Sequence, residues 1–162
     1  MRFTLQAAVT KAATFSGTAL EFGSAGVRQI QRIREYIFTL KVTSAERDTG
    51  NETYDVYVTT GDDGGSWDIV HFPQIATTGA KTYQARVMTD RMAEVTTATP
   101  GVAAEPIAVL KTDTAAADQG IKTLSAGKVR HGPIGNKFSH ELVVAGTVVT
   151  GIAYSITVEG RG

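Results

Sequence analysis

The stretch Thr53–Ile75, TYDVYVTTGDDGGSWDIVHFPQI, decides the fold of this chain. Its first part, Thr53–Thr60, alternates apolar and polar side chains with the period of two that a half-buried strand requires. The turn Gly61–Gly65 follows, and Ser66–Phe72 returns with a second set of strand-forming residues. The stretch therefore predicts a tight antiparallel hairpin whose turn is centred on Asp62–Gly65.

Short segments of the same kind recur between turn residues along the rest of the chain. Thr, Val and Ala recur in them, and several of the 17 glycines separate them. Many short strands at such spacing predict an all-β fold, and we expect an antiparallel β-sandwich. Ile30, Ile33 and Ile37 also keep helical spacing, so a short helical turn before Glu35 is left open. The further predicted strands are Arg2–Val9, Ala19–Phe22, the later half of Val27–Val42, Lys81–Met88, Ile107–Leu110, Lys137–Ala145 and Val148–Glu159.

Size and charge limit the classes of protein to which the chain can belong. Its residues 1–162 suit a single domain with a sizeable core. The 16 basic and 16 acidic side chains balance, whereas a nucleic-acid-binding protein normally carries a basic surplus. No apolar run approaches the ~18 residues of a membrane span, and the lack of cysteine excludes disulfides and thiolate sites. We therefore expect neither a nucleic acid nor a membrane as a partner.

Residues 89–128 differ in composition from the rest of the domain. They are rich in Ala, Thr and small polar residues, and only Ile107–Leu110 has the character of a buried strand. So few large apolar groups do not bury enough surface to offset the ordering entropy, ~1–2 kcal/mol per residue. We interpret the segment as an extended insertion or arm that is ordered by contact with another chain. The expected inter-chain contacts, within a homo-oligomer or against another protein, are Ile107, Val109 and Leu110.

The turn of the predicted hairpin carries the sharpest local motif. The residues TGDDGGSW at 60–67 resemble the Asp-box, a turn of the form Ser/Thr-x-Asp-x-Gly-x-Ser/Thr-Trp. Thr60 opens the motif, Asp62 can accept hydrogen bonds from backbone N–H groups, and Gly64 can take a positive φ. Ser66 can tie back to the loop, and we expect Trp67 to be largely buried at the base of the strands. This is a structural turn, and a single box argues against a sialidase, which needs several.

The sequence carries no spacing typical of a catalytic site. His71, His131 and His140 are isolated, and none belongs to an HxxxH or HExxH motif. No serine lies in a G-x-S-x-G elbow, and the glycine-rich residues 132–136 lack the Lys-Ser/Thr of a P-loop. We expect each histidine to be a satisfied core or surface residue, and we expect neither an enzyme nor a cofactor. A catalytic pair of carboxylates depends on distance in space, so the sequence leaves that alternative open.

A calcium site near the turn is a second alternative that the sequence leaves open. Asp62, Asp63 and Asp68 would offer hard oxygen ligands in or beside a glycine-rich loop. However, the spacing of an EF-hand is absent, and adjacent acidic residues in a turn are more often solvated. Alternation along the second strand also turns Asp68 away from the turn. We therefore expect no bound metal.

The whole stretch Thr53–Ile75 resembles a run found in phage and prophage structural proteins. That run has a strand of the DVxVxTS type, an Asp-Gly-Gly turn, a Trp and a D-I-x-H-F-x-Q segment, and it covers about a seventh of this chain. Members of this group are similar to jelly-roll or related β-sandwich proteins on capsid or tail surfaces. The resemblance implies a jelly-roll-like capsid decoration (cement) protein of a bacteriophage virion, made in the host cytoplasm. Its expected partner is the major capsid protein, bound at the capsid surface without catalysis.

Two other functions remain open beside capsid decoration. A phage tail structural protein fits the same resemblance, and a β-sandwich also suits a carbohydrate- or ligand-binding module. A sugar binder generally needs a cluster of exposed aromatic rings, and the chain has one Trp, 5 Tyr and 6 Phe. Most of these lie on alternating strands, where we expect the core to bury them. The composition therefore favours a structural module.

Overall fold

The computed structural model describes residues 1–23, 32–62, 65–90, 107–109, 111–112 and 124–162. In this part the chain forms twelve β-strands and no helix, so the predicted all-β class is confirmed and no helix long enough to cross a membrane occurs. Most of the segment for which a helical turn was left open lies outside the described residues. The strands are β1 Arg2–Lys11, β2 Phe15–Ser16, β3 Leu20–Glu21, β4 Glu35–Ala45, β5 Thr53–Asp62, β6 Gly65–His71, β7 Lys81–Met88, β8 Ile107–Val109, β9 Lys111–Thr112, β10 Lys128–Val129, β11 Lys137–Ala145 and β12 Ile152–Arg161.

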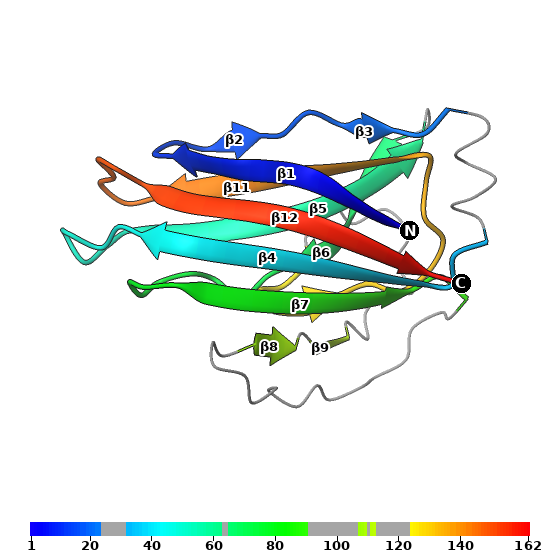
Figure 1. Ribbon diagram of the computed structural model, residues 1–162. Helices are drawn as coiled ribbons and strands as arrows, with labels where there is room; N and C mark the ends of the chain where they lie inside the picture. The colour runs from blue at the N-terminus through cyan, green and yellow to red at the C-terminus, as the bar shows by residue number, and fades with distance from the viewer. Residues whose placement is uncertain (24–31, 63–64, 91–106, 110, 113–123) are drawn as a thin grey trace.

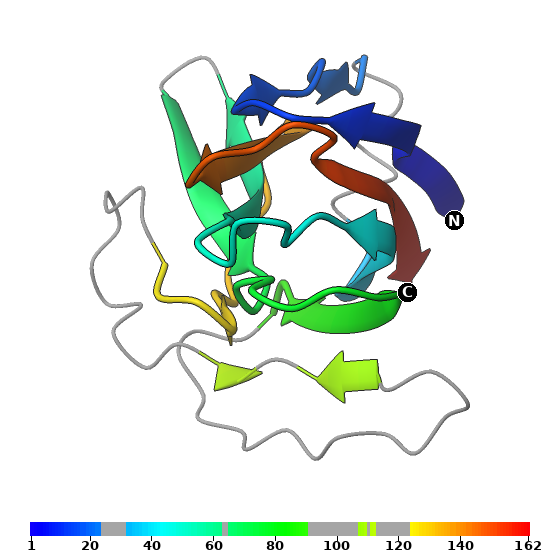
Figure 2. The same cartoon turned by 90° about the vertical axis from the view of Figure 1, so that its left-hand side faces the viewer.

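The strands form two sheets that pack face to face as a β-sandwich (Figures 1 and 2). The first sheet has the order β1-β12-β4-β7-β8, and the second has the order β2-β11-β5-β6-β10-β9, with β3 also paired to β11. Among the described strands, only the pairs β7–β8 and β9–β10 are parallel. The predicted antiparallel sandwich is therefore confirmed, and parallel pairing is confined to short strands of the insertion and its end.

The long antiparallel pairs are nested around the β5–β6 turn. β5 pairs with β6 across that turn, β4 pairs with β7, β11 pairs with both β2 and β3, and β1 pairs with β12. We treat β2 and β3 as one interrupted strand and leave out β8 to β10. The first strand of the chain then pairs with the last, the second with the second last, and so on inward to β5 and β6. The chain thus resembles one long hairpin with its tip at Asp62–Gly65. This long hairpin is rolled up, because β12 also pairs with β4 in the first sheet and β11 also pairs with β5 in the second.

The core lies between the sheets and is filled by alternate residues of the strands. On β5, Tyr54 and Val56 are fully buried, while Asp55 and Tyr57 point to the outer face, as the alternation predicts. Phe138 of β11 is the centre of an aromatic cluster between the sheets. Its partners, with ring centroids 5.2 to 6.0 Å away, are Phe3, Phe22, Tyr36 and Phe38.

Two strands have the predicted ends, and one begins later than predicted for a physical reason. β7 and β11 match Lys81–Met88 and Lys137–Ala145, whereas β12 begins at Ile152 and not at Val148. The residues between form a turn that requires Gly151 at a φ of 85°. The backbone N–H groups of residues 149–151 donate to the Glu46 carboxylate, so they are not available for a strand ladder.

Part of the insertion belongs to the sandwich itself. β8 runs parallel to β7 at the edge of the first sheet, and β9 runs parallel to β10 at the edge of the second. Both short strands lie on the same side of the molecule, beyond β7 (Figure 2). The predicted strand Ile107–Leu110 is confirmed over Ile107–Val109, and β9 is an addition. Residues 91–106, 110 and 113–123 lie outside the described residues.

Candidate functional site on the outer face of the second sheet

A β-bulge in β6 brings two polar side chains to one face of the second sheet. In the β5–β6 pair, Thr59 lies opposite Asp68 and Tyr57 lies opposite His71, so two steps along β5 match three steps along β6. Residues three apart in a regular strand point to opposite faces. The extra residue in β6 instead puts Asp68 and His71 together on the outer face.

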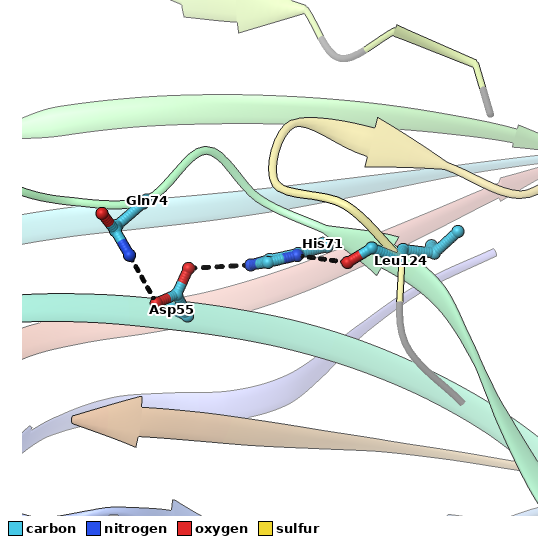
Figure 3. Close-up of polar contacts among 4 residues, drawn as sticks. All are labelled: Asp55, His71, Gln74 and Leu124. Carbon is cyan, nitrogen blue, oxygen red and sulfur yellow. Dashed lines mark hydrogen bonds and ion pairs between the residues drawn. The ribbon is translucent and has the colours of Figure 1, made fainter. Parts of the chain in front are cut away.

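His71 makes polar contacts with both of its ring nitrogens (Figure 3). Nδ1 lies 2.7 Å from the backbone oxygen of Leu124, and Nε2 lies 2.9 Å from Oδ1 of Asp55. Both partners are acceptors, so both contacts are hydrogen bonds only when both ring nitrogens carry a proton. The ring is buried, and the Tyr57 ring stacks on it with centroids 3.9 Å apart. The geometry therefore fits a charged imidazolium paired with a carboxylate.

Asp55 is oriented by a second hydrogen bond. The side-chain amide of Gln74 donates to Oδ2 of Asp55 at 2.9 Å, while Oδ1 faces His71 (Figure 3). Asp55 belongs to β5 and Gln74 to the loop after β6, so a residue outside the strand pair helps to position this carboxylate. The carboxylate is thereby fixed where it can accept a hydrogen bond from His71.

Asp68 holds the other backbone group of Leu124. Its carboxylate accepts a hydrogen bond from the Leu124 N–H, and the positive charge of Arg130 attracts it. Asp68 is only 7% exposed, and this burial raises the pKa of its carboxyl to about 6, although the hydrogen bond and Arg130 act to lower it. Asp68 therefore exchanges its proton much closer to neutral pH than an ordinary aspartate does.

These contacts hold residues 124–130 against β6, where the chain returns from the insertion to the sandwich. Asp68 and His71 together bind both backbone groups of Leu124. The N–H groups of Gly127 and Arg130 then donate to carbonyl groups of β6, at 2.9 and 2.8 Å. We call the following side chains the His71 cluster: Asp55, Tyr57, Asp68 and His71.

The His71 cluster is suited to binding backbone groups and exchanging protons. Within the described ranges, no three His, Asp or Glu side chains are grouped so that they could hold a metal ion. Of the three acidic residues considered for calcium, Asp63 and the side chain of Asp62 lie outside the described residues. The third, Asp68, is engaged with Leu124.

The predicted structural turn lies at the tip of the hairpin, and the structure describes part of it. Gly64 and the side chain of Asp62 lie outside the described residues, so their roles stay predictions. Ser66 is exposed. Trp67 packs against the core but is only partly buried, which is less than predicted, because it lies two positions from the turn near the end of the strand pair.

Thr60 is buried and has a role that the turn motif does not predict. Its hydroxyl donates to the backbone oxygen of Lys137 at 2.9 Å and accepts a hydrogen bond from the Gly135 N–H at 3.0 Å. Gly135 passes so close that a Cβ atom there would lie 2.0 Å from the Gly61 oxygen. Thr60 therefore ties the hairpin to the loop that precedes β11.

The predicted inter-chain contacts fall on β8 and the residue after it. The backbone of Ile107 lies opposite Thr82, and that of Val109 lies opposite Gln84, both in β7 of the same chain. Leu110 and the side chains of Ile107 and Val109 lie outside the described residues, so their contact with another chain stays a prediction.

The other two histidines are buried, and each has at least one hydrogen-bond partner. Nδ1 of His131 accepts a hydrogen bond from the Met88 N–H at 2.9 Å. Nε2 of His140 lies 3.1 Å from the hydroxyl of Tyr154, between the two sheets, and burial lowers the pKa of His140 to about 4. Nδ1 of His140 is buried without a hydrogen-bond partner. His140 is therefore a neutral polar residue of the core.

Sequence reasoning missed the pairing of Asp68 with His71, although a signal for it exists. In the segment WDIVH two consecutive apolar residues, Ile69 and Val70, stand between two polar ones and break the alternation. Both are buried, which is typical of a bulge inside a strand pair. The involvement of Leu124 has no local signal, because it depends on the return path of a segment more than 50 residues away.

Glu46 was also missed, since it lies in a stretch that has the composition of a polar loop. Its carboxylate accepts hydrogen bonds from the backbone N–H groups of Val149, Thr150 and Gly151. The bond from Gly151 contributes most to lowering the pKa of Glu46, against the effect of burial. The carboxylate thus stabilises the turn before β12.

Comparison of the chain with protein-family models, curated proteins and solved structures gives no match.

Proposed function

We propose that this chain is a structural protein of a phage virion, which decorates and stabilises the capsid by binding the major capsid protein without catalysis. The nested strand pairing carries the proposal. The pairs β1–β12, β2/β3–β11, β4–β7 and β5–β6 are those of a long hairpin that has been rolled up, and they support the jelly-roll-like connectivity that the resemblance implies. Jelly rolls recur in viral capsid proteins.

A fold alone does not determine a function, so the resemblance of Thr53–Ile75 to phage structural proteins is the second support. This stretch builds the β5–β6 hairpin, which is the tip around which the other pairs are nested. The segment that carries the resemblance is thus the one that organises the sandwich.

The distribution of aromatic residues favours a structural module over a sugar binder. Sugar binding generally uses exposed rings, whereas every Trp, Tyr and Phe of this chain is at least partly buried. The exposed large hydrophobic residues among those described are Met1 and Val149. Neither is aromatic, and neither offers a platform on which a sugar ring could stack.

The direct test is to mix the purified chain with undecorated capsids, and to follow binding by co-sedimentation and electron microscopy. We expect saturable binding at symmetry-related positions and cross-links to the major capsid protein. Capsids that are already decorated are the matched control and should take up no further chain. Phage tails and a polysaccharide panel are tested in parallel. Retention on tails or on a polysaccharide, without binding to capsids, would replace the proposal by one of the alternatives.

A second arm of the test concerns the insertion. Because β8 and β9 pair within the chain, a Gly/Ser linker should replace only residues 91–106 and leave 107–112 in place. If this segment contacts the capsid or a second copy, the variant should fold normally and lose capsid occupancy or oligomerisation. Unchanged occupancy and assembly would remove residues 91–106 from the proposed interface and leave Ile107, Val109 and Leu110 as its predicted contacts.

A further inference from the structure

We propose that His71 is a proton-sensitive fastener, whose charged ring holds Leu124 to the second sheet and releases it when the ring loses a proton. The fastener depends on contacts within one chain, so it is independent of capsid decoration. It would control how firmly residues 124–130, which lead from the insertion back to the sandwich, are attached to β6.

The inference rests on the number of protons that the His71 ring holds. Nδ1 and Nε2 of His71 lie 2.7 and 2.9 Å from two acceptors, the Leu124 oxygen and the Asp55 carboxylate. A neutral imidazole has one N–H group, so one of these contacts then brings two lone pairs together. The carboxylate is the stronger acceptor and keeps the remaining proton on Nε2. Loss of the other proton therefore breaks the contact with Leu124.

The groups around His71 come from four elements and have both signs of charge. The nearest is the Asp55 carboxylate, at 2.9 Å. Opposite His71 on β10 lies Lys128, whose like charge opposes that of the ring. The charged and titratable groups that face the cluster are Asp55 and Tyr57 of β5, Asp68 of β6, Glu141 of β11, and Lys128 and Arg130 of the returning segment.

Asp68 adds a second pH dependence to the same attachment. Its carboxylate accepts the Leu124 N–H, and burial raises its pKa to about 6. Because this pKa lies above the ordinary value of 3.8, the attached state favours the neutral carboxyl. Loss of the Asp68 proton as pH rises through about 6 therefore weakens the attachment in the same direction as loss of the His71 proton.

The experiment follows amide hydrogen exchange of the intact chain by NMR between about pH 5 and pH 9, with the ¹⁵N shifts of the His71 ring as the direct report of its protons. The informative amides are Leu124 and Gly127, whose N–H groups bond to Asp68 and to the His71 carbonyl. The reference is Phe72, which donates to Val56 within the hairpin. After correction for intrinsic rates, protection at Leu124 and Gly127 should fall about tenfold as the ring deprotonates, while Phe72 does not change.

Two variants separate the fastener from the other contacts of the ring. His71→Asn puts an amide nitrogen near the position of Nδ1, so it can donate to Leu124 at every pH. His71→Gln reaches toward Asp55 and leaves the Leu124 oxygen without its donor. Both lose the Tyr57 stacking alike. Leu124 should therefore stay protected at alkaline pH in the Asn variant and be unprotected at every pH in the Gln variant.

The inference is overturned if the ¹⁵N shifts show a singly protonated ring across the whole range, or if protection at Leu124 does not follow its titration. Equal protection in the Asn and Gln variants would overturn it as well. If neither variant folds, the titration of the unaltered chain still decides the question.

Discussion

Asp68 and His71 lie three positions apart on β6 and still face the same residue, Leu124, one binding its N–H and the other its carbonyl oxygen. Leu124 is buried, so both of its backbone groups need partners. The bulge in β6 provides them by turning Asp68 to the face that His71 occupies. A local irregularity of one strand thus anchors a distant part of the chain.

Replacing Asp68 by Asn should stabilise the chain more at neutral than at acidic pH. The folded-state pKa of Asp68, about 6, lies above the ordinary value of 3.8, so its contribution is greatest at low pH and is lost as pH rises through about 6. The gain from Asp68→Asn should be about 2 kcal/mol larger at about pH 7.5 than at about pH 4.5. Urea unfolding at both pH values measures it, and a gain that does not vary with pH would contradict the buried-charge explanation.

His140 should give the opposite pH dependence. Burial lowers its pKa from 6.5 to about 4, so the unfolded chain binds the proton more readily, and stability is lost as pH falls through this interval. In the unaltered chain this loss should reach about 2–3 kcal/mol near pH 4.5. His140→Gln, which can still bond to Tyr154, should not show it. The same urea titrations apply, and parallel acid profiles for both chains would argue against the prediction.

Gly17 should tolerate no side chain, because it packs directly against the His140 ring. A Cβ atom at Gly17 would lie 1.9 Å from Cε1 of that ring, which is enclosed in the core. Gly17→Ala should therefore lower the free energy of unfolding by about 1–3 kcal/mol. Gly23→Ala is the matched control, since nothing lies within 4 Å of its Cβ position. We expect the control to change stability by less than about 0.5 kcal/mol.

Thr60→Val tests the tie between the hairpin and the loop before β11. The two side chains have nearly the same shape, but Val leaves the Gly135 N–H and the Lys137 oxygen without the hydroxyl. The expected loss of stability is about 1–2 kcal/mol by chemical denaturation. Thr157→Val, on the half-buried outer face of β12, is the control and should be nearly neutral. Equal effects at the two positions would remove the special role of Thr60.

Trp67→Ala should cost less than the truncation of a fully buried aromatic residue. Because the ring packs against the core and is only partly buried, we expect a loss of about 2 kcal/mol, below the ~3–5 kcal/mol typical of a buried site. Thermal or urea unfolding gives the value. Binding of polysaccharides is followed in the same samples, since a loss of sugar binding with little loss of stability would favour the ligand-binding alternative.

Much of the fold could be predicted because half-buried strands leave a period of two in their sequence. Lys81–Met88 shows it over most of its length and Lys137–Ala145 over its first part, and both are strands with those ends. Strand pairing could not be predicted in the same way. β1 and β12 lie at opposite ends of the chain, and no local pattern shows that Phe3 lies opposite Val158.

The candidate site could not be predicted from the sequence for a related reason. Alternation assigns Asp68 and His71 to opposite faces, and only the bulge brings them together. Leu124 takes part in the site through its backbone groups. Every residue has such groups, so the amino-acid composition does not indicate this role. The carboxylate of Glu46 likewise bonds to backbone N–H groups more than 100 residues away.

The nested pairing also determines how chain entropy is lost during folding. Once β5 and β6 have paired, β4 and β7 are already close, so each pair shortens the loop that the next must close. The insertion lies between β7 and β11 and therefore lengthens the loop closed when β11 joins β5, β2 and β3. Each doubling of that loop costs about 0.6 kcal/mol. Insertions of very different length can thus be accommodated at this place, while the β4–β7 and β5–β6 pairs form as before.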